Sequence, residues 1–242
     1  MTKLTNQVAV VTGAGSGIGR AIALALATTG VRLRLVGRSC EKLEAVADIA
    51  RRAAPDVRCV QADLVCDEEI LDLAAGVRQD VGYLDLLIHC AGCITLGSLE
   101  SALIEDFDRQ YRINVRAPYL LTQLLLPMLR SRRGQIVFMN SSAGQIATGN
   151  VSQYAATKHA LRAVADSLRH EINADGIRVL SIYPGRTASP MQASVHAAEG
   201  KDYDPDRLMQ PEDVAAAIIN ALSLPRSAEV TDIHMRPALK PI

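Results

Sequence analysis

Short apolar segments alternate with helical patterns along almost the whole chain, and this alternation limits the possible fold more than any other feature. Strands that alternate with helices form βαβ units around a mostly parallel sheet, so we predict an α/β fold with a doubly wound sheet of about seven strands between two helix layers. The expected strands are residues 7–12, 31–36, 57–61, 84–89, 135–139, 177–183 and 231–235. The expected helices are residues 20–29, 41–54, 67–81, 104–129, 153–174 and one that begins at Pro211. Arg32 and Arg34 interrupt the second strand.

Two other segments depart from a regular pattern. Pro118 lies inside the segment 104–129, and a proline in a helix interior bends or divides the helix. Residues 189–210 have the least regular pattern of all, which indicates a flexible segment at the mouth of a binding site. No repeat or linker interrupts the chain before that segment. We therefore expect one domain over residues 1–242, with a substrate lid near residues 187–210.

The charge balance excludes several classes of protein. The 26 Lys and Arg residues equal the 26 Asp and Glu residues in number, whereas nucleic-acid-binding domains usually carry a basic surplus. No apolar run reaches the ~18 residues that a membrane span needs. The stretch before Ala21 is glycine-rich and nearly uncharged, which is wrong for a secretory signal. We expect a cytoplasmic protein whose five cysteines are reduced, without a nucleic-acid or membrane partner.

A glycine-rich loop follows the first expected strand directly and leads into a helix. Glycines allow a tight turn and a close approach to a pyrophosphate, and the helix N-terminus offers free N–H groups. The spacing is T-G-x-x-x-G-x-G, because Ile18 stands where the third glycine of G-x-G-x-x-G would fall. A glycine turn without a ligand is the alternative to a Rossmann-type dinucleotide site. The predicted loop contacts are Gly13, Gly15, Ser16, Gly17, Ile18 and Gly19.

The end of the second strand indicates which dinucleotide binds. An acidic residue there would select NAD, but this chain has Gly37 followed by Arg38 and Ser39. No carboxylate repels a 2′-phosphate and Arg38 can pair with one, so NADP(H) is favoured over NAD(H). The alternative is that Arg38 is a solvated loop cation, since the glycine loop contains no second basic residue. Ser39, Asp63 and Leu64 complete the predicted contacts at this end of the cofactor; Asp63 is a candidate acceptor for the adenine amino group or an ordinary loop aspartate.

Tyr154 and Lys158 are the central candidates for catalysis, because residues four apart share one face of a helix. A phenol has a pKa of ~10, and a nearby ammonium, helped by the positive nicotinamide ring of an oxidised cofactor, lowers it into a range useful for proton transfer. Ser141 ends the fifth strand, where open α/β sheets bind ligands, and can hold a substrate oxygen; Ser142 competes for that role. Asn114, taken alone, is more typical of an amide on a helix surface.

In this order and spacing, the glycine loop, these polar residues and the run Tyr183-Pro184-Gly185 resemble the short-chain dehydrogenase/reductase family. The resemblance covers nearly the whole chain, and the gap between Tyr154 and Lys158 is similar to that of the carbonyl reductase and alcohol dehydrogenase branch.

The resemblance implies a role for each residue. Tyr154 would exchange a proton with the substrate oxygen that Ser141 positions, while hydride passes between nicotinamide C4 and the substrate carbon. Lys158 would lower the pKa of Tyr154 and bind the nicotinamide ribose, and Asn114 would hold a water that relays protons to solvent. By the same resemblance, the remaining cofactor contacts are Tyr154, Lys158, Ala91, Gly92, Pro184, Gly185 and Thr187, with Ser189 as the alternative to Thr187.

The chain departs from the family pattern after the fourth strand. The family usually has Asn-Asn-Ala-Gly there, whereas this chain has His89-Cys90-Ala91-Gly92. Cys90 cannot supply amide hydrogen bonds, so we expect altered local bonding with the chemistry intact. Cys90 and Cys93 also form a C-x-x-C, but no second ligand pair has zinc spacing, and we expect no metal and no redox role.

These features together predict an oxidoreductase that transfers hydride between NADP(H) and a carbonyl or secondary alcohol substrate. The alternatives are an NAD-dependent alcohol or 3-hydroxy acid dehydrogenase and a non-catalytic dinucleotide-binding redox sensor. A serine hydrolase is disfavoured, because G-x-S-x-G is absent around Ser141. The expected partner is a small molecule, and the expected assembly is a homotetramer, with a dimer second. The lid offers a mixed set of side chains, namely Met191, Val195, His196, Tyr203, Leu208 and Met209.

Overall fold

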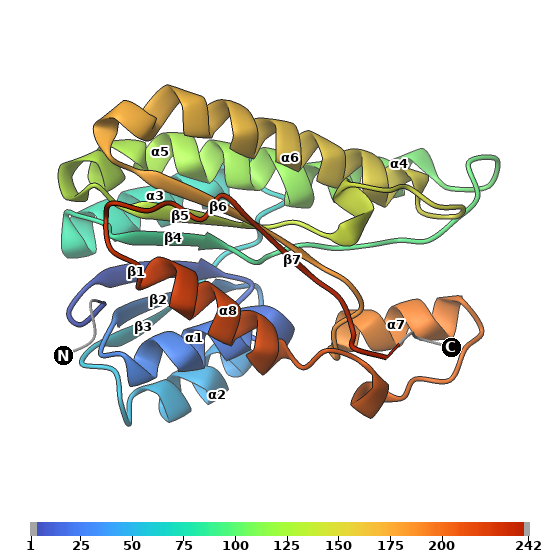
Figure 1. The fold of residues 1–242 in the computed structure, drawn as a ribbon, viewed down its shortest axis with the longest axis horizontal. Helices are drawn as coiled ribbons and strands as arrows, with labels where there is room; N and C mark the ends of the chain where they lie inside the picture. Colours follow the sequence, from blue (N-terminus) through green and yellow to red (C-terminus); the bar gives the residue numbers. More distant parts are fainter. Residues whose placement is uncertain (1–3, 240–242) are drawn as a thin grey trace.

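A computed structural model describes residues 4–239, so the outermost three residues at each end of the expected domain lie outside the described part. Its centre is a seven-stranded sheet in the order β3-β2-β1-β4-β5-β6-β7, and every neighbouring pair is parallel (Figure 1). The strands are β1 (Val8–Thr12), β2 (Arg32–Gly37), β3 (Val57–Gln61), β4 (Leu86–His89), β5 (Gln135–Met139), β6 (Arg178–Pro184) and β7 (Asp232–Met235). The chain reverses its direction of travel across the sheet between β1 and β4, and such a switch point is where open α/β sheets bind ligands. The predicted doubly wound α/β fold is confirmed.

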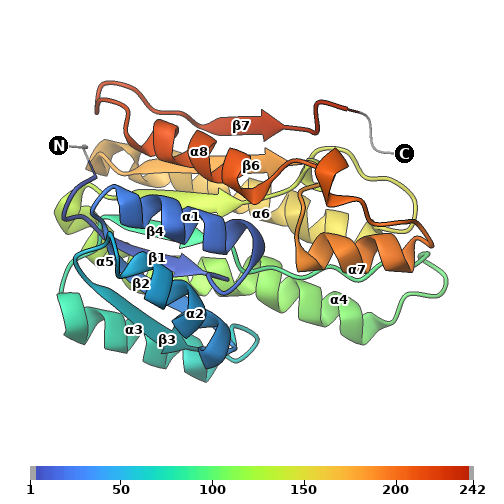
Figure 2. The same cartoon turned by 90° about the horizontal axis from the view of Figure 1, so that it is seen from below.

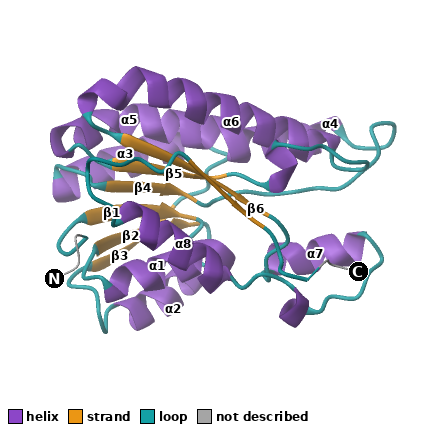
Figure 3. Cartoon of the chain, viewed as in Figure 1, coloured by secondary structure: helices purple, strands orange, loops and turns teal. Residues whose placement is uncertain are grey.

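Helices cover both faces of this sheet, as Figures 1 and 3 show. One layer holds α1 (Gly17–Thr28), α2 (Cys40–Ala50) and α8 (Pro211–Leu222). The other holds α3 (Asp67–Val81), α5 (Ala117–Arg132) and α6 (Ser152–Ile172). Alternate residues of a strand face opposite layers, so Ala9 and Val11 pack toward α1 and α8, while Val8 and Val10 pack toward α3 and α5. Because both faces are covered, β1 is buried at every position.

The segment expected as one helix over residues 104–129 is divided. It consists of α4 (Ile104–Tyr111), a π-helical turn (Arg112–Arg116) and α5. The turn lies directly before Pro118, which has no N–H for a regular helical bond, and the N–H of Ala117 bonds back to the carbonyl of Arg112. The predicted effect of Pro118 is therefore found, and Asn114 lies in the turn rather than in a regular helix.

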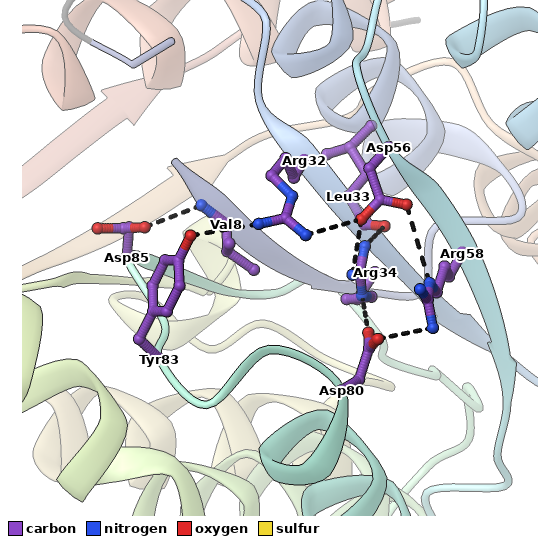
Figure 4. Close-up of polar contacts among 9 residues, drawn as sticks. All are labelled: Val8, Arg32, Leu33, Arg34, Asp56, Arg58, Asp80, Tyr83 and Asp85. Carbon is purple, nitrogen blue, oxygen red and sulfur yellow. Dashed lines mark hydrogen bonds and ion pairs between the residues drawn. The ribbon is translucent and has the colours of Figure 1, made fainter. Parts of the chain in front are cut away.

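Arg32 and Arg34 do not interrupt β2, which runs unbroken through both residues. Arg34 is completely buried beneath α3, where it forms ion pairs with Asp56 and Asp80 (Figure 4). The expectation of an interrupted strand is corrected, because the charge is neutralised by residues distant in the sequence.

The expected irregular segment contains a helix, α7 (Pro190–Ala198), which lies beyond the C-terminal ends of the strands in Figure 2. Its start follows from local chemistry, since Pro190 is the first helical residue and Ser189 accepts a hydrogen bond from the N–H of Gln192. The two ends of the segment meet in a parallel bridge between Thr187 and Met209. None of the described helices is long and apolar enough to cross a membrane.

Candidate active site

A cleft of about 1130 Å³ opens at the C-terminal ends of the strands. It is lined by the glycine loop, by the residues that follow β2 to β6, and by the first turns of α6 and α7. Every predicted site residue lines this cleft except Asn114, which lies behind its wall.

Two glycines of the loop pack too closely against backbone atoms to be replaced by residues with a side chain. A Cβ on Gly13 would stand 2.8 Å from the backbone nitrogen of Ala91, and one on Gly19 would stand 2.3 Å from the carbonyl oxygen of Gly13. Gly13 and Gly17 also have φ values of 67° and 51°, which disfavour other residues. Ser16 precedes α1, but its side chain makes no capping hydrogen bond. The first N–H groups of α1 are therefore not occupied by the Ser16 hydroxyl. Such a helix start is suited to bind a phosphate.

Basic side chains lie at the end of the cleft formed by β2 and β3. Arg38 is exposed there, and among the described residues no carboxylate lies within ion-pairing distance of its guanidinium. Lys42 also lines the cleft, and its Cβ is 3.2 Å from the position of a Cβ on Gly15. Lys42 was not among the predicted site residues. Ser39 could have indicated this position, because serine is a residue type that starts helices. A helix that starts at Ser39 places Lys42 one turn beyond Arg38.

Asp63 lies across this end of the cleft from Arg38. Its Oδ1 accepts a hydrogen bond from the N–H of Val65 at 3.1 Å, and its own N–H donates to Glu69 at 2.7 Å. These bonds give Asp63 a role in shaping the loop, and its contact with adenine stays a prediction.

The catalytic candidates meet where β5 and α6 face each other. Ser141 interacts with the phenol of Tyr154, and its Oγ also accepts a hydrogen bond from the N–H of Ala143 at 3.1 Å. The Lys158 ammonium donates to the carbonyl of Met139 at 2.8 Å and lies 5.7 Å from the centre of the Tyr154 ring. Between the two candidate serines, the contact with Tyr154 favours Ser141.

Burial dominates the acid–base properties of this group within the protein's own side chains. Burial raises the pKa of Tyr154 to about 12, although the hydrogen bond to Ser141 opposes the rise. Burial also lowers the pKa of Lys158 to about 8. Tyr154 is therefore a neutral phenol at pH 7 in this arrangement, a form that can donate a proton. The lowering expected from Lys158 together with the positive nicotinamide ring of an oxidised cofactor stays a prediction.

Asn114 is buried and fully engaged by its neighbours. Its Oδ1 accepts from the N–H of Cys93 at 2.9 Å, and its Nδ2 donates to the carbonyl of Cys93 at 2.9 Å and to Thr157 at 3.0 Å. The amide thus joins the segment after β4 to α6, next to Lys158. Asn114 is not a surface amide; its predicted role in a water relay stays a prediction.

The residues that replace the family's usual asparagines form their own set of bonds. The Thr12 hydroxyl accepts from the backbone N–H groups of Cys90 and Ala91 at 3.1 and 3.2 Å. His89 stacks on Phe138 and forms a 2.8 Å hydrogen bond with Thr122, and burial lowers the pKa of His89 to about 3. His89 is therefore neutral at pH 7.

The two cysteines of the C-x-x-C motif are protonated thiols in this environment. Burial raises the pKa of Cys90 to about 12, and it also raises the pKa of Cys93. A thiolate is the form that attacks disulfides and binds metals. The environment of both residues thus disfavours the chemistry for which such motifs are known.

Thr187 and Ser189 are the two candidates to contact the nicotinamide end of the cofactor. The hydroxyl of each one donates a hydrogen bond to a backbone carbonyl. Thr187 is buried and donates to the carbonyl of Gly185 at 3.1 Å. Ser189 caps α7 and faces the glycine loop, since a Cβ on Gly17 would stand 3.3 Å from the Cβ of Ser189. Both residues line the cleft, and neither assignment is preferred by this geometry.

A dinucleotide-sized cleft at a switch point, a glycine loop on a helix start and a Ser–Tyr–Lys group define a nicotinamide-dependent oxidoreductase. Comparison with known proteins agrees, because the short chain dehydrogenase family model matches residues 7–200, and the chain belongs to that family, whose members bind nicotinamide dinucleotides and act on small molecules. An uncharacterized oxidoreductase of Staphylococcus aureus (strain N315) is 33% identical over 238 residues, which cover 98% of this chain and 100% of the relative.

Solved structures of similar proteins share the whole fold. An alcohol dehydrogenase from the archaeon Thermococcus sibiricus, complexed with 5-hydroxy-NADP, superposes with a TM-score of 0.88 at 26% identity and covers 98% of this chain and 99% of its own. A metagenomic short-chain oxidoreductase in complex with NADP superposes with a TM-score of 0.84 at 29% identity, with the same coverage. Levodione reductase has a TM-score of 0.87 at 26% identity and covers 96% of each chain.

Proposed function

We propose that this protein is an NADPH-dependent reductase of ketones or aldehydes. The observation that carries the proposal is the neutral Tyr154 phenol, held against Ser141 in the cleft with the Lys158 ammonium one helical turn away. A phenol in this position can give its proton to a carbonyl oxygen as hydride reaches the carbonyl carbon, which is the proton transfer that carbonyl reduction needs.

The residues divide the reaction between them. The Ser141 hydroxyl donates a hydrogen bond to the carbonyl oxygen of the substrate and places it against the Tyr154 hydroxyl. Tyr154 then gives its proton to that oxygen as negative charge develops there. The buried Lys158 ammonium stabilises the tyrosinate that remains. The bound nicotinamide cofactor supplies the hydride that reduces the carbonyl carbon, so one hydride and one proton convert the ketone or aldehyde to an alcohol.

The adenosine end of the cleft supports NADPH as the cofactor. Arg38 has no carboxylate partner among the described residues, Lys42 adds a second cation, and Gly37 stands where an acidic residue would select NAD. The complexes of two similar structures, with 5-hydroxy-NADP and with NADP, are in keeping with this choice. Guanidinium groups bind phosphate through charge-assisted hydrogen bonds.

Separate fluorescence titrations with NADPH and NADH test the cofactor assignment. Arg38→Ala should weaken NADPH binding by about tenfold or more and leave NADH binding nearly unchanged, because only NADPH carries the 2′-phosphate. Arg52→Ala is the matched control, since Arg52 is an exposed arginine that follows α2 and does not line the cleft. Equal binding of NADH and NADPH by the wild-type protein would overturn the assignment.

Turnover tests the enzyme assignment independently. The wild-type protein should oxidise NADPH in the presence of members of a ketone and aldehyde panel, as followed by absorbance of the reduced cofactor. Tight cofactor binding with no turnover across the panel would instead support the redox-sensor alternative.

A further inference from the structure

Beyond the adenosine end, the cleft contains few charged side chains. In the described part of the chain, only Lys158, Arg186 and Glu199 are charged and line it there. Lys158 is buried and bonded to the carbonyl of Met139, so its charge serves the proton-transfer group. The neighbouring wall includes apolar side chains, namely Ile94, Leu96, Ile146, Val151, Met191 and Val195.

Arg186 and Glu199 neutralise each other across this part of the cleft. Nη2 of Arg186 lies 2.6 and 2.8 Å from the two carboxylate oxygens of Glu199, and both side chains are less than one-third exposed. Arg186 stands directly after the end of β6, whereas Glu199 follows the last turn of α7. The pair therefore connects the base of the lid segment to the far end of its helix. The hydrogen bond from Arg186 holds the pKa of Glu199 below its ordinary value, so the carboxylate stays charged at pH 7.

A second cation approaches Glu199 from outside the cleft. Nζ of Lys201 lies 3.5 Å from Glu199, but this side chain is about half exposed and does not line the cleft. Arg109 and Asp106 of α4 act on Cys93 electrostatically without lining the cleft. Beyond the adenosine end, Arg186 is thus the cleft-lining cation that does not belong to the proton-transfer group, and Glu199 pairs with it.

We propose that Glu199 masks Arg186 and thereby restricts this site to uncharged carbonyl substrates, so that keto acids are rejected. The inference rests on the proposed reductase function and names the substrate class of the same site. A substrate carboxylate would have to displace Glu199 or lie unpaired beside it, and both arrangements leave a partly buried negative charge without its partner. An uncharged ketone of the same shape meets no such penalty. A preference for uncharged ketones distinguishes this reductase from a 3-hydroxy acid dehydrogenase, the alternative that the sequence left open.

Keto acids and their own methyl esters provide the test, because each pair differs only at one end, where the ester replaces the negative charge by a methyl group. We would use 4-oxopentanoate and 4-acetylbenzoate, each with its methyl ester, and measure kcat/KM with saturating NADPH. The wild-type protein should prefer each ester over its acid by at least about 100-fold, since an unpaired partly buried charge costs a few kcal/mol. Glu199→Gln should raise kcat/KM for the acids by about tenfold or more and change it for the esters by less than about threefold.

Two further variants assign the gain to Arg186. The double variant Arg186→Met with Glu199→Gln should lose the gain for the acids, because the unmasked guanidinium is gone. Lys201→Met is the matched control: it removes the other cation beside Glu199 and should leave the acid-to-ester ratio unchanged. Thermal unfolding of each variant shows whether the fold has survived.

The outcomes of this experiment separate the two proposals. Equal use of acids and esters by the wild-type protein, with loss of acid turnover in Arg186→Met, would show that Arg186 binds carboxylates and would overturn the masking proposal while the reductase function stands. An acid-to-ester ratio that Glu199→Gln does not change would overturn it as well. Failure of every ester and every acid, despite NADPH binding, would overturn the reductase function and the masking proposal with it.

Discussion

Two groups of polar side chains in this molecule each contain a buried cation, and their contrast separates stability from chemistry. The Arg34 cluster lies beneath α3 and consists of Arg32, Arg34, Asp56, Arg58 and Asp80 (Figure 4). The catalytic group lies at the C-terminal end of the sheet and consists of Ser141, Tyr154 and Lys158. Each contains a cation that is almost completely buried, since Arg34 is 1% and Lys158 is 4% exposed.

The Arg34 cluster pairs its buried cation completely. The guanidinium of Arg34 contacts Asp56 at 2.8 Å, forms an ion pair with Asp80, and donates to the carbonyl of Leu33 at 3.0 Å. Arg58 adds a 2.6 Å contact to Asp80 from the neighbouring strand. A buried charge with this many partners has little freedom to change its position.

Lys158 has no carboxylate partner within ion-pairing distance in the described part of the chain, and its contact is a backbone carbonyl. Its pKa is lowered by burial, and the pKa of the adjacent Tyr154 is raised by burial. The comparison teaches that an unpaired buried cation beside a titratable group indicates a reactive site, whereas a paired one indicates structure.

The largest expected effect comes from the reactive group. Tyr154→Phe removes the hydroxyl that carries the proton, so kcat/KM for ketone reduction should fall by ~10³-fold. NADPH binding and the free energy of unfolding should change little, because the ring remains. Tyr119→Phe is the matched control on the exposed face of α5 and should be neutral. Retention of more than a tenth of the wild-type kcat/KM would remove Tyr154 from the proposed mechanism.

The structural group should behave in the opposite way. Arg34→Ala leaves a cavity and deprives Asp56 and Asp80 of a buried partner, so the free energy of unfolding should fall by about 3 kcal/mol in urea titrations. Activity per folded molecule should stay within about twofold of wild type. Arg58→Ala removes a largely exposed partner of the same Asp80 and should cost less than about 1 kcal/mol. Similar losses for the two variants would contradict the assignment of Arg34 as the buried centre of the cluster.

Features that depend on local sequence patterns could be predicted from the sequence. The βαβ order and the glycine loop depend on local patterns, and the bounds of β3, α3 and β5 agree with the prediction. The residues that line the cleft were found because they follow successive strands of a parallel sheet, whose C-terminal ends meet at one edge.

What the sequence did not show depends on contacts between distant residues. Arg34 reads as a break in a strand because its partners lie 22 and 46 residues away. The Tyr-x-x-x-Lys spacing shows the lysine but not the burial, which raises the pKa of Tyr154 within the protein's own side chains. The pairing of Arg186 with Glu199 depends on helix α7. Ser189 and Pro190 are a local signal for the start of this helix, but the irregular pattern of the segment hid it.

A third prediction sharpens the contrast through stability alone. Lys158→Met should inactivate the protein and yet raise its free energy of unfolding at pH 7 by about 1 to 2 kcal/mol. The reason is that the folded pKa of about 8 lies below the ordinary value of 10.5, so burial of the charge opposes folding at pH 7. Loss of the bond to Met139 offsets part of the gain.

The pH dependence of this variant follows from the same shift. Below pH 8 the lysine is protonated in both folded and unfolded protein, and the cost of burial is fully present. Between pH 8 and 10.5 the unfolded chain binds more protons, so the wild-type protein gains stability and the advantage of Lys158→Met should shrink. A variant less stable than wild type at pH 7 would show that the Lys158 ammonium stabilises the fold.

The smallest expected effect concerns the rim of the Arg34 cluster. Burial favours the neutral form of Asp56, yet the guanidiniums of Arg34 and Arg32 outweigh it and hold the pKa of this carboxyl below its ordinary value of 3.8. The carboxylate therefore contributes stability above pH 3.8, and this contribution is lost as the pH falls through the lower folded pKa. Asp56→Asn should cost about 1 kcal/mol at pH 7, because Asp56 is 26% exposed and solvent screens its pairs. Urea titrations from pH 7 to pH 3 should show the two proteins converging at the acid end. If the difference in free energy of unfolding stays constant over this pH range, Asp56 acts through packing. Asp80 would then be the carboxylate that stabilises the buried Arg34 by its charge.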